Sequence, residues 1–115
     1  MEIEFTRELV TRKAKDVFPR EDTSKIMGIL DEYGVRPHEQ ERERVQLAIL
    51  KLSGGEVEKL REEVKVAKRD YRDVLVYAEY PLWAESPLPK EGTREAKEFD
   101  EKNRKQYLDW LNGKP

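Results

Sequence analysis

The feature that most constrains the fold is a run of apolar residues at alternating steps of three and four. Its members are Val57, Leu60, Val64, Ala67, Tyr71, Val74 and Ala78. Such steps return to one side of an α-helix, and a seam of this kind packs along another helix at about +20°. The spacing predicts one continuous helix over 57–78, about 35 Å long at 1.5 Å per residue. This helix would be the spine of a helical bundle.

Two shorter amphipathic helices are expected before this seam. Residues 5–18 and 23–33 each place apolar side chains on one helical face. Thr6 is the expected N-cap of the first helix, because its hydroxyl can accept a backbone N–H of the first turn. Three adjacent residues compete to cap the second helix: Asp22, Thr23 and Ser24.

A third helix should lie at the centre of the bundle. Residues 45–52 are apolar on nearly every side of a helix, which predicts that other helices surround them. Before it, Gly34 followed by Val35 matches a Schellman end for the second helix. After it, Ser53 and Glu56 have the spacing of a capping box at the start of the seam helix.

The C-terminal part divides into a connection and a helix. Three prolines in residues 80–92 exclude a continuous helix there and predict an extended segment. Residues 93–112 form an amphipathic pattern with acidic residues early and basic residues later, as the helix dipole favours. No alternating run is long enough for a sheet. The sequence therefore predicts a single all-α domain over 1–115, a bundle of about five helices.

Composition limits the classes of function. The 115 residues include 23 Lys and Arg against 25 Asp and Glu, so the net charge is −2 although 42% of residues are charged. This balance argues against proteins that coat nucleic acids or bind membranes through a basic surface. No run approaches the roughly 20 apolar residues of a membrane span, and residues 1–4 lack the features of a signal peptide. We expect a cytoplasmic protein.

The absence of cysteine excludes disulfides, thiolate zinc sites and cysteine nucleophiles. The single histidine, His38, cannot provide a three-His zinc site or a pair of Glu-x-x-His motifs within one chain. It is expected to be a solvated side chain. Abundant Glu and Lys with few Asn and Gln are typical of thermophilic proteins. We expect no cofactor and no catalytic residue.

One group of acidic residues supports an enzymatic alternative. Its members are Glu62, Glu63, Asp70 and Asp73. Carboxylates of this kind hold magnesium in all-α nucleotide hydrolases. Basic residues alternate with these acids, however, and favour an exposed face of helical ion pairs. A magnesium-dependent nucleotide hydrolase therefore remains the alternative to a non-catalytic protein.

Nucleic-acid and anion binding are further alternatives. The second and third helices with the turn at Gly34 have the length of a helix-turn-helix unit. Acidic residues outnumber basic ones where the recognition helix would begin, Glu39, Glu41 and Glu43 against Arg42 and Arg44, which disfavours DNA binding. The amides of residues 53–55 could face an anion at a helix N-terminus, but a helix cap explains the same residues.

The aromatic and proline segment offers the best partner site. The candidate residues are Tyr80, Leu82, Trp83 and Leu88. Tyr and Trp dominate the anchors of protein interfaces, so this segment could dock a partner. Alternatively, Leu82 and Trp83 could cover the core by packing against the C-terminal helix.

Three runs, Arg44–Leu52 (RVQLAILKL), Lys68–Leu75 (KRDYRDVL) and Ala78–Pro81 (AEYP), resemble a group of small bacterial helical proteins. The resemblance covers residues 20–81. It implies a bacterial cytosolic helical domain. No activity is established for that group, so the resemblance supplies no catalytic or binding residues.

These observations together predict a non-catalytic helical interaction or regulatory module. It would bind a protein partner or a second copy of itself. The residues expected to mediate self-association are those of the seam: Val57, Leu60, Val64, Ala67 and Tyr71.

Overall fold

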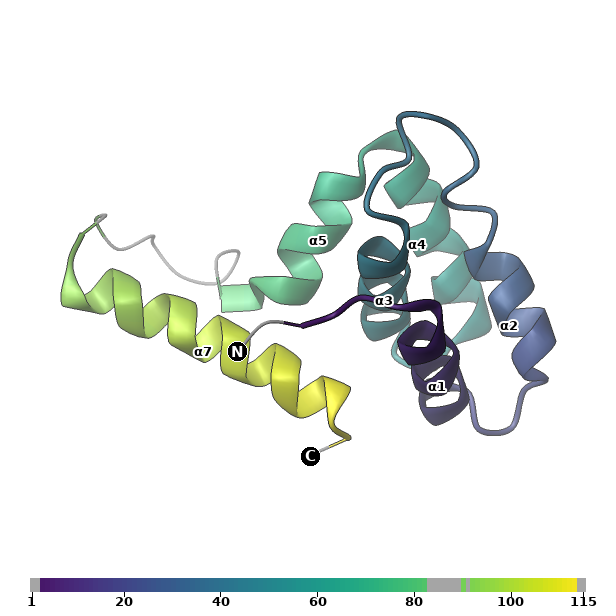
Figure 1. Cartoon of the computed structure of the whole chain (residues 1–115), viewed down its shortest axis with the longest axis horizontal. Helices are drawn as coiled ribbons and strands as arrows, with labels where there is room; N and C mark the ends of the chain where they lie inside the picture. The colour runs from purple at the N-terminus through teal and green to yellow at the C-terminus, as the bar shows by residue number, and fades with distance from the viewer. Residues whose placement is uncertain (1–2, 83–89, 91, 114–115) are drawn as a thin grey trace.

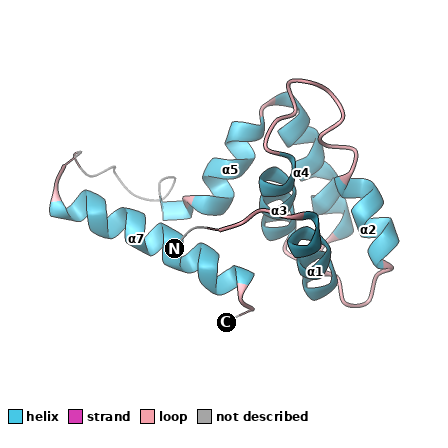
Figure 2. Ribbon diagram, viewed as in Figure 1, coloured by secondary structure: helices cyan, strands magenta, loops and turns pink. Residues whose placement is uncertain are grey.

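Every regular element in the computed structural model is a helix, as the sequence predicts (Figure 1, Figure 2). The structure describes residues 3–82, 90 and 92–113, and this part contains no strand. The helices are α1 (Arg7–Val17), α2 (Thr23–Leu30), α3 (Arg42–Ser53), α4 (Val57–Arg69), α5 (Tyr71–Glu79) and α7 (Arg94–Leu111). The all-helical fold class is confirmed.

Helix α3 lies at the centre of the bundle. It packs against α1, α4 and α5, while α2 packs against α1 and α4. The six consecutive side chains from Val45 to Leu50 are all buried. A helix that is buried on every side needs neighbours on every side, which is why its sequence shows no polar face here. The prediction of a central third helix is confirmed.

Three helices begin at side-chain caps: Thr6 as predicted, Asp22 from the three competing candidates, and Thr93. The Thr6 hydroxyl accepts the Leu9 N–H at 3.1 Å at the start of α1. Asp22 is the N-cap of α2, and its carboxylate accepts the Ser24 N–H at 2.9 Å. Thr93 caps α7, so the C-terminal helix begins where the sequence predicts. These caps supply acceptors for backbone donors that have no partner within the helix.

The prediction of one continuous spine helix over 57–78 is wrong. Helix α4 ends at Arg69, α5 begins at Tyr71, and Asp70 between them is extended with φ −156° and ψ 101°. Helix α3 has 12 residues and is therefore about 18 Å long, too short to cover a straight 35 Å helix. The break lets both halves of the seam pack on α3. The spacing of the seam in the sequence is still that of one helix, because its α4 part and its α5 part both face the core.

The predicted Schellman end at Gly34 is also wrong. Helix α2 ends at Leu30, and Gly34 lies in the following loop with φ +102°. The N–H groups of Gly34 and Val35 donate instead to the Glu39 carboxylate, at 2.8 and 3.1 Å. Val35 is 75% exposed, so it forms no apolar contact that would close a helix end. A buried carboxylate has replaced the expected backbone motif.

The capping box predicted before α4 does not form, although α4 begins at the expected place. The Ser53 hydroxyl donates to the Leu50 carbonyl oxygen at 2.6 Å. The N-cap residue Glu56 makes no side-chain cap bond. The chain turns through Gly54 and Gly55, both with positive φ, which glycine adopts without steric cost.

Helix α7 lies beside α5, on the side of the bundle away from α2 (Figure 1). Two side-chain amides hold it there. Asn103 is buried and accepts the Leu82 N–H at 3.2 Å, and Gln106 donates to the Ala78 carbonyl oxygen at 3.2 Å. Most of the connection predicted over residues 80–92 lies outside the described residues, so its extended form stays a prediction.

Candidate functional site

The end of α5 exposes aromatic side chains. Tyr77 is 55% and Tyr80 42% exposed, and the only other exposed large apolar side chain among the described residues is Val35. Leu82 is half-buried, while Trp83 and Leu88 lie outside the described residues. Tyr77 belongs to the same group of aromatic residues in the sequence, but the predicted contact residues did not include it. Its position off the apolar seam could have indicated its exposure.

A groove of about 790 Å³ adjoins Tyr80. It lies between the segment before α1, the end of α5 and one side of α7, which approach one another on this side of the bundle (Figure 1). The lining residues are Ile3, Phe5, Arg44, Glu79, Tyr80, Lys97, Asp100, Glu101, Arg104 and Tyr107. Its volume falls in the usual range of ligand and anchor pockets.

An ion pair between α3 and α5 lines the groove. The Arg44 guanidinium donates to both Glu79 carboxylate oxygens, at 2.8 and 2.6 Å. This pairing raises the pKa of Arg44 above its ordinary value, although burial acts in the opposite direction. The guanidinium also lies 6.0 Å from the centre of the Phe5 ring. The two charges therefore neutralise each other within the groove.

Tyr107 contributes a buried hydroxyl that has no hydrogen-bond partner among the described residues. The residue is 3% exposed, and its ring contacts Trp110 with centroids 5.7 Å apart. Burial, assisted by the nearby Glu79 carboxylate, raises its pKa above the ordinary value. The hydroxyl therefore stays protonated at neutral pH and can donate a hydrogen bond.

The α7 wall of the groove carries equal numbers of opposite charges. Lys97 and Arg104 are cationic, and Asp100 and Glu101 are anionic. Together with the Arg44–Glu79 pair, these residues leave the groove without a net charge. Shape and apolar contact must therefore decide what binds here more than electrostatic attraction does.

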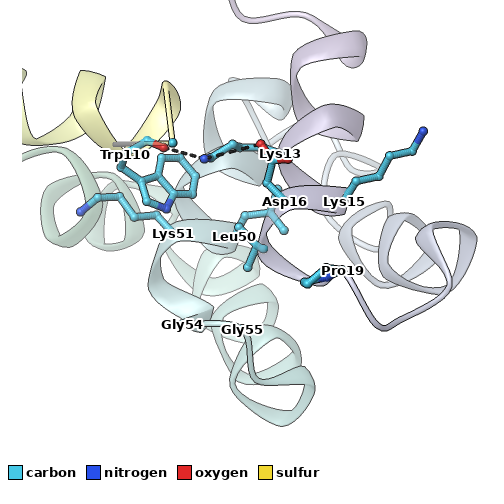
Figure 3. Close-up of a pocket in the computed structure, with 11 residues that line it drawn as sticks. Lys13, Lys15, Asp16, Pro19, Leu50, Lys51, Gly54, Gly55 and Trp110 are labelled. Atoms are coloured by element: carbon cyan, nitrogen blue, oxygen red, sulfur yellow. Dashed lines mark hydrogen bonds and ion pairs between the residues drawn. The ribbon is translucent and has the colours of Figure 1, made fainter. Parts of the chain in front are cut away.

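A second cleft, of about 740 Å³, lies where the C-terminal ends of α1, α3 and α7 meet (Figure 3). Lys13 is buried there, donates to the Trp110 carbonyl oxygen at 2.5 Å and lies 4.5 Å from the centre of the Trp110 ring. Lys15 and Lys51 line the same cleft. Burial lowers the pKa of Lys13 and of Lys51.

Lys13 stabilises the C-terminal end of α7. The last carbonyl groups of a helix carry partial negative charge, and a nearby ammonium group compensates them. In Figure 3 the ammonium groups of Lys15 and Lys51 point away from each other, so the three lysines do not converge on one position. Gly54 and Gly55 line the cleft, but this geometry does not favour the anion site considered for residues 53–55.

The acidic residues of the magnesium hypothesis do not gather into one site. Glu62 and Asp73 are exposed, Glu63 pairs with Lys59 at 3.5 Å, and Asp70 pairs with Arg72 at 3.0 Å. No group of three or more Asp, Glu or His side chains in the part of the chain that the structure describes is arranged to hold a metal ion. These contacts agree with the interpretation as an ion-paired face.

The seam residues proposed for self-association lie against the core of their own chain. Leu60, Val64 and Ala67 are buried, and Val57 and Tyr71 are partly buried against the same core. A dimer that used this seam directly would have to open the bundle.

The single histidine, His38, is exposed, and its imidazole lies 3.8 Å from the Glu39 carboxylate.

The helix-turn-helix alternative gains no support from the positions of its residues. The side chains Val45–Leu50 of α3 are buried, so this helix has no free face for a DNA groove. Arg42 pairs with Asp31 at 3.1 Å, and Arg44 pairs with Glu79. The cations at the start of α3 are thus engaged with carboxylates.

Comparison with known protein families, curated proteins and solved structures finds no match to this chain. The resemblance seen in the sequence therefore stays a prediction. Over the described ranges, no helix combines the length and hydrophobicity that crossing a bilayer requires.

Proposed function

We propose that this protein is a non-catalytic helical interaction module that binds a protein partner over the end of α5 and the adjoining groove. The proposed contact residues are Tyr77, Tyr80 and Leu82, with Trp83 and Leu88 continuing the segment. We also propose that it acts in the cytoplasm.

The observation that carries this proposal is the exposure of two tyrosines at the C-terminal end of α5: Tyr77 in its last turn and Tyr80 at its C-cap. Elsewhere in the described chain the large apolar side chains are buried or half-buried, apart from Val35. Tyrosine is enriched among residues that dominate binding energy, because a rigid ring and a hydroxyl combine apolar area with a hydrogen bond. Two such residues, one of which lines a groove, are typical of an anchor site.

The groove favours a partner segment that presents aliphatic or aromatic side chains. Phe5, Ile3 and Tyr80 offer apolar surface in the groove. Since the charges lining the groove balance, we do not expect a strongly acidic or basic partner.

Site-specific photo-cross-linking tests the location of the surface. A photoreactive phenylalanine analogue is placed at Tyr80 and, as the control, at Glu58, which is exposed on α4. We expect one protein to cross-link from position 80 and not from position 58. The purified partner must then bind the unmodified chain and be displaced by unlabelled chain. Identical cross-linking patterns from the two positions would contradict the proposal.

A further inference from the structure

The break between α4 and α5 occupies a single residue. Only Asp70 leaves the helical region, while its neighbours Arg69 and Tyr71 belong to helices. The apolar seam continues through the break with the spacing of an unbroken helix, from Ala67 to Tyr71 to Val74. A change of φ and ψ at Asp70 to ordinary helical values would therefore join α4 and α5 into one helix.

The local contacts that maintain this break are polar and exposed. The Asp70 carboxylate accepts the Arg72 N–H at 3.1 Å and pairs with the Arg72 guanidinium at 3.0 Å. The Arg72 side chain is 76% exposed, so the ion pair contributes little. Residues 68–72 contain no glycine or proline, and nothing in their covalent structure forbids a helix.

The packing of α5 on α3 makes the larger contribution to its position. Val74 and Ala78 are fully buried, and Glu79 pairs with Arg44 of α3. None of these contacts requires α3 and α5 to belong to the same chain. If α5 leaves its own α3, the α3 of a second copy offers the same apolar surface and the same arginine. This equivalence is the basis of domain exchange between identical chains.

Helix α7 would move together with α5. Asn103 and Gln106 bind backbone groups at the end of α5 and in the residues that follow it. The contacts of α7 with α1, such as that of Trp110 with Lys13, could be restored on the second copy in the same way. The exchanged unit is therefore α5 with α7, and the seam residues stay buried in both forms.

We propose that Asp70 is the hinge of a domain exchange, in which α4 and α5 join into one helix and α5 with α7 packs on the α3 of a second copy of this chain. The monomer and the exchanged dimer share their core contacts. Their balance is then set by protein concentration and by the conformation of Asp70.

Substitutions at Asp70 test the hinge in opposite directions. Asp70→Ala removes the N-cap of α5 and favours a continuous helix, whereas Asp70→Gly disfavours a helix interior and is tolerated at an N-cap. Loss of an Asp cap shifts the equilibrium between the broken and the continuous helix by about tenfold toward the continuous helix. Each exchanged dimer contains two such continuous helices, so the two effects multiply. The full chain is refolded at high concentration and its monomer–dimer equilibrium measured by sedimentation. We expect the association constant of Asp70→Ala to rise about a hundredfold, with Asp70→Gly no more dimeric than wild type.

Charge exchange tests whether α3 and α5 meet across chains. In the Asp70→Ala background, Arg44→Glu and Glu79→Arg each place like charges at the α3–α5 contact. In a mixed exchanged dimer each α3 meets the α5 of the other variant, so opposite charges face each other at both contacts. We expect co-refolding of the two variants to give more heterodimer than the statistical share. A monomeric Asp70→Ala, or a mixture without this excess, would overturn the proposal.

Discussion

The ammonium group of Lys13 lies over the indole of Trp110 and donates a hydrogen bond to the Trp110 carbonyl oxygen at 2.5 Å. The two residues are 97 positions apart in sequence. This contact joins the first helix to the last and compensates the carbonyl end of α7. Its closest carboxylate partner, Asp16, is 3.9 Å away. The indole and the helix end therefore stabilise this buried cation more than an ion pair does.

Replacing Lys13 by methionine keeps much of its apolar stem and removes the charge. We expect Lys13→Met to lower the free energy of unfolding by about 1–2 kcal/mol, because the Trp110 carbonyl loses its charged donor and keeps only the backbone N–H of Gly113. Lys13→Ala should cost more, since the contact of the stem with the indole is also lost. Chemical denaturation measures both. Lys15→Met, at an exposed position of the same helix, is the control and should change stability by less than about 0.5 kcal/mol.

Two glycines should respond oppositely to alanine. Gly28 lies inside α2 with open space around its missing Cβ, so Gly28→Ala should stabilise the protein by about 0.5–1 kcal/mol. Gly34 has φ +102°, and a Cβ there would lie 2.6 Å from the Arg42 Cγ atom. Gly34→Ala should destabilise by about 1–3 kcal/mol. Equal effects of the two substitutions on thermal unfolding would show that the loop at Gly34 does not have the left-handed conformation described above.

The buried Glu39 carboxylate should make stability depend on acid pH. Burial alone would raise its pKa, but hydrogen bonds from Gly34, Val35 and Lys68 lower it to about 2. Its folded pKa lies below the ordinary value, so its stabilising contribution is present above about pH 4.5 and is lost as pH falls toward 2. We expect Glu39→Gln to destabilise by about 1.5–3 kcal/mol at pH 7 and to weaken this acid dependence. Denaturation curves across this pH range measure both effects.

A matched substitution separates Glu39 from the general effect of charge. Glu62→Gln removes an acid at an exposed position of α4 and should leave stability within about 0.5 kcal/mol of wild type at every pH. If the two variants show the same pH dependence, the loop from Gly34 to Glu39 does not depend on the buried carboxylate.

Local sequence patterns predict helices well here, but they do not predict where long-range contacts bend the chain. Thr6 and Thr93 mark helix starts because capping involves only neighbouring residues. The break at Asp70 has a local signal, because Asp70 caps α5, but the apolar seam hides it: both sides of the seam face the core whether or not the helix is straight. The break could be predicted only by comparing the length of α3 with that of the seam, because α3 is too short to cover a straight helix over 57–78.

The candidate site likewise has one part that the local sequence predicts and another that depends on the tertiary fold. The aromatic segment at Tyr80 is visible from composition alone, and the exposed position of Tyr77 follows from the seam. The other parts of the groove come from distant segments. Phe5, Arg44 and Tyr107 are brought together by the tertiary fold, and no spacing between them in the sequence could indicate that they share a surface.

The most direct test of the proposed function compares the affinity of the cross-linked partner for the wild-type chain and for the double variant Tyr77→Ala/Tyr80→Ala. Exposed anchors cost about 1–2 kcal/mol each when truncated, so we expect binding to weaken by about thirtyfold or more. The free energy of unfolding, measured in parallel, should change by less than about 1 kcal/mol. Unchanged affinity in a folded double variant would contradict the account.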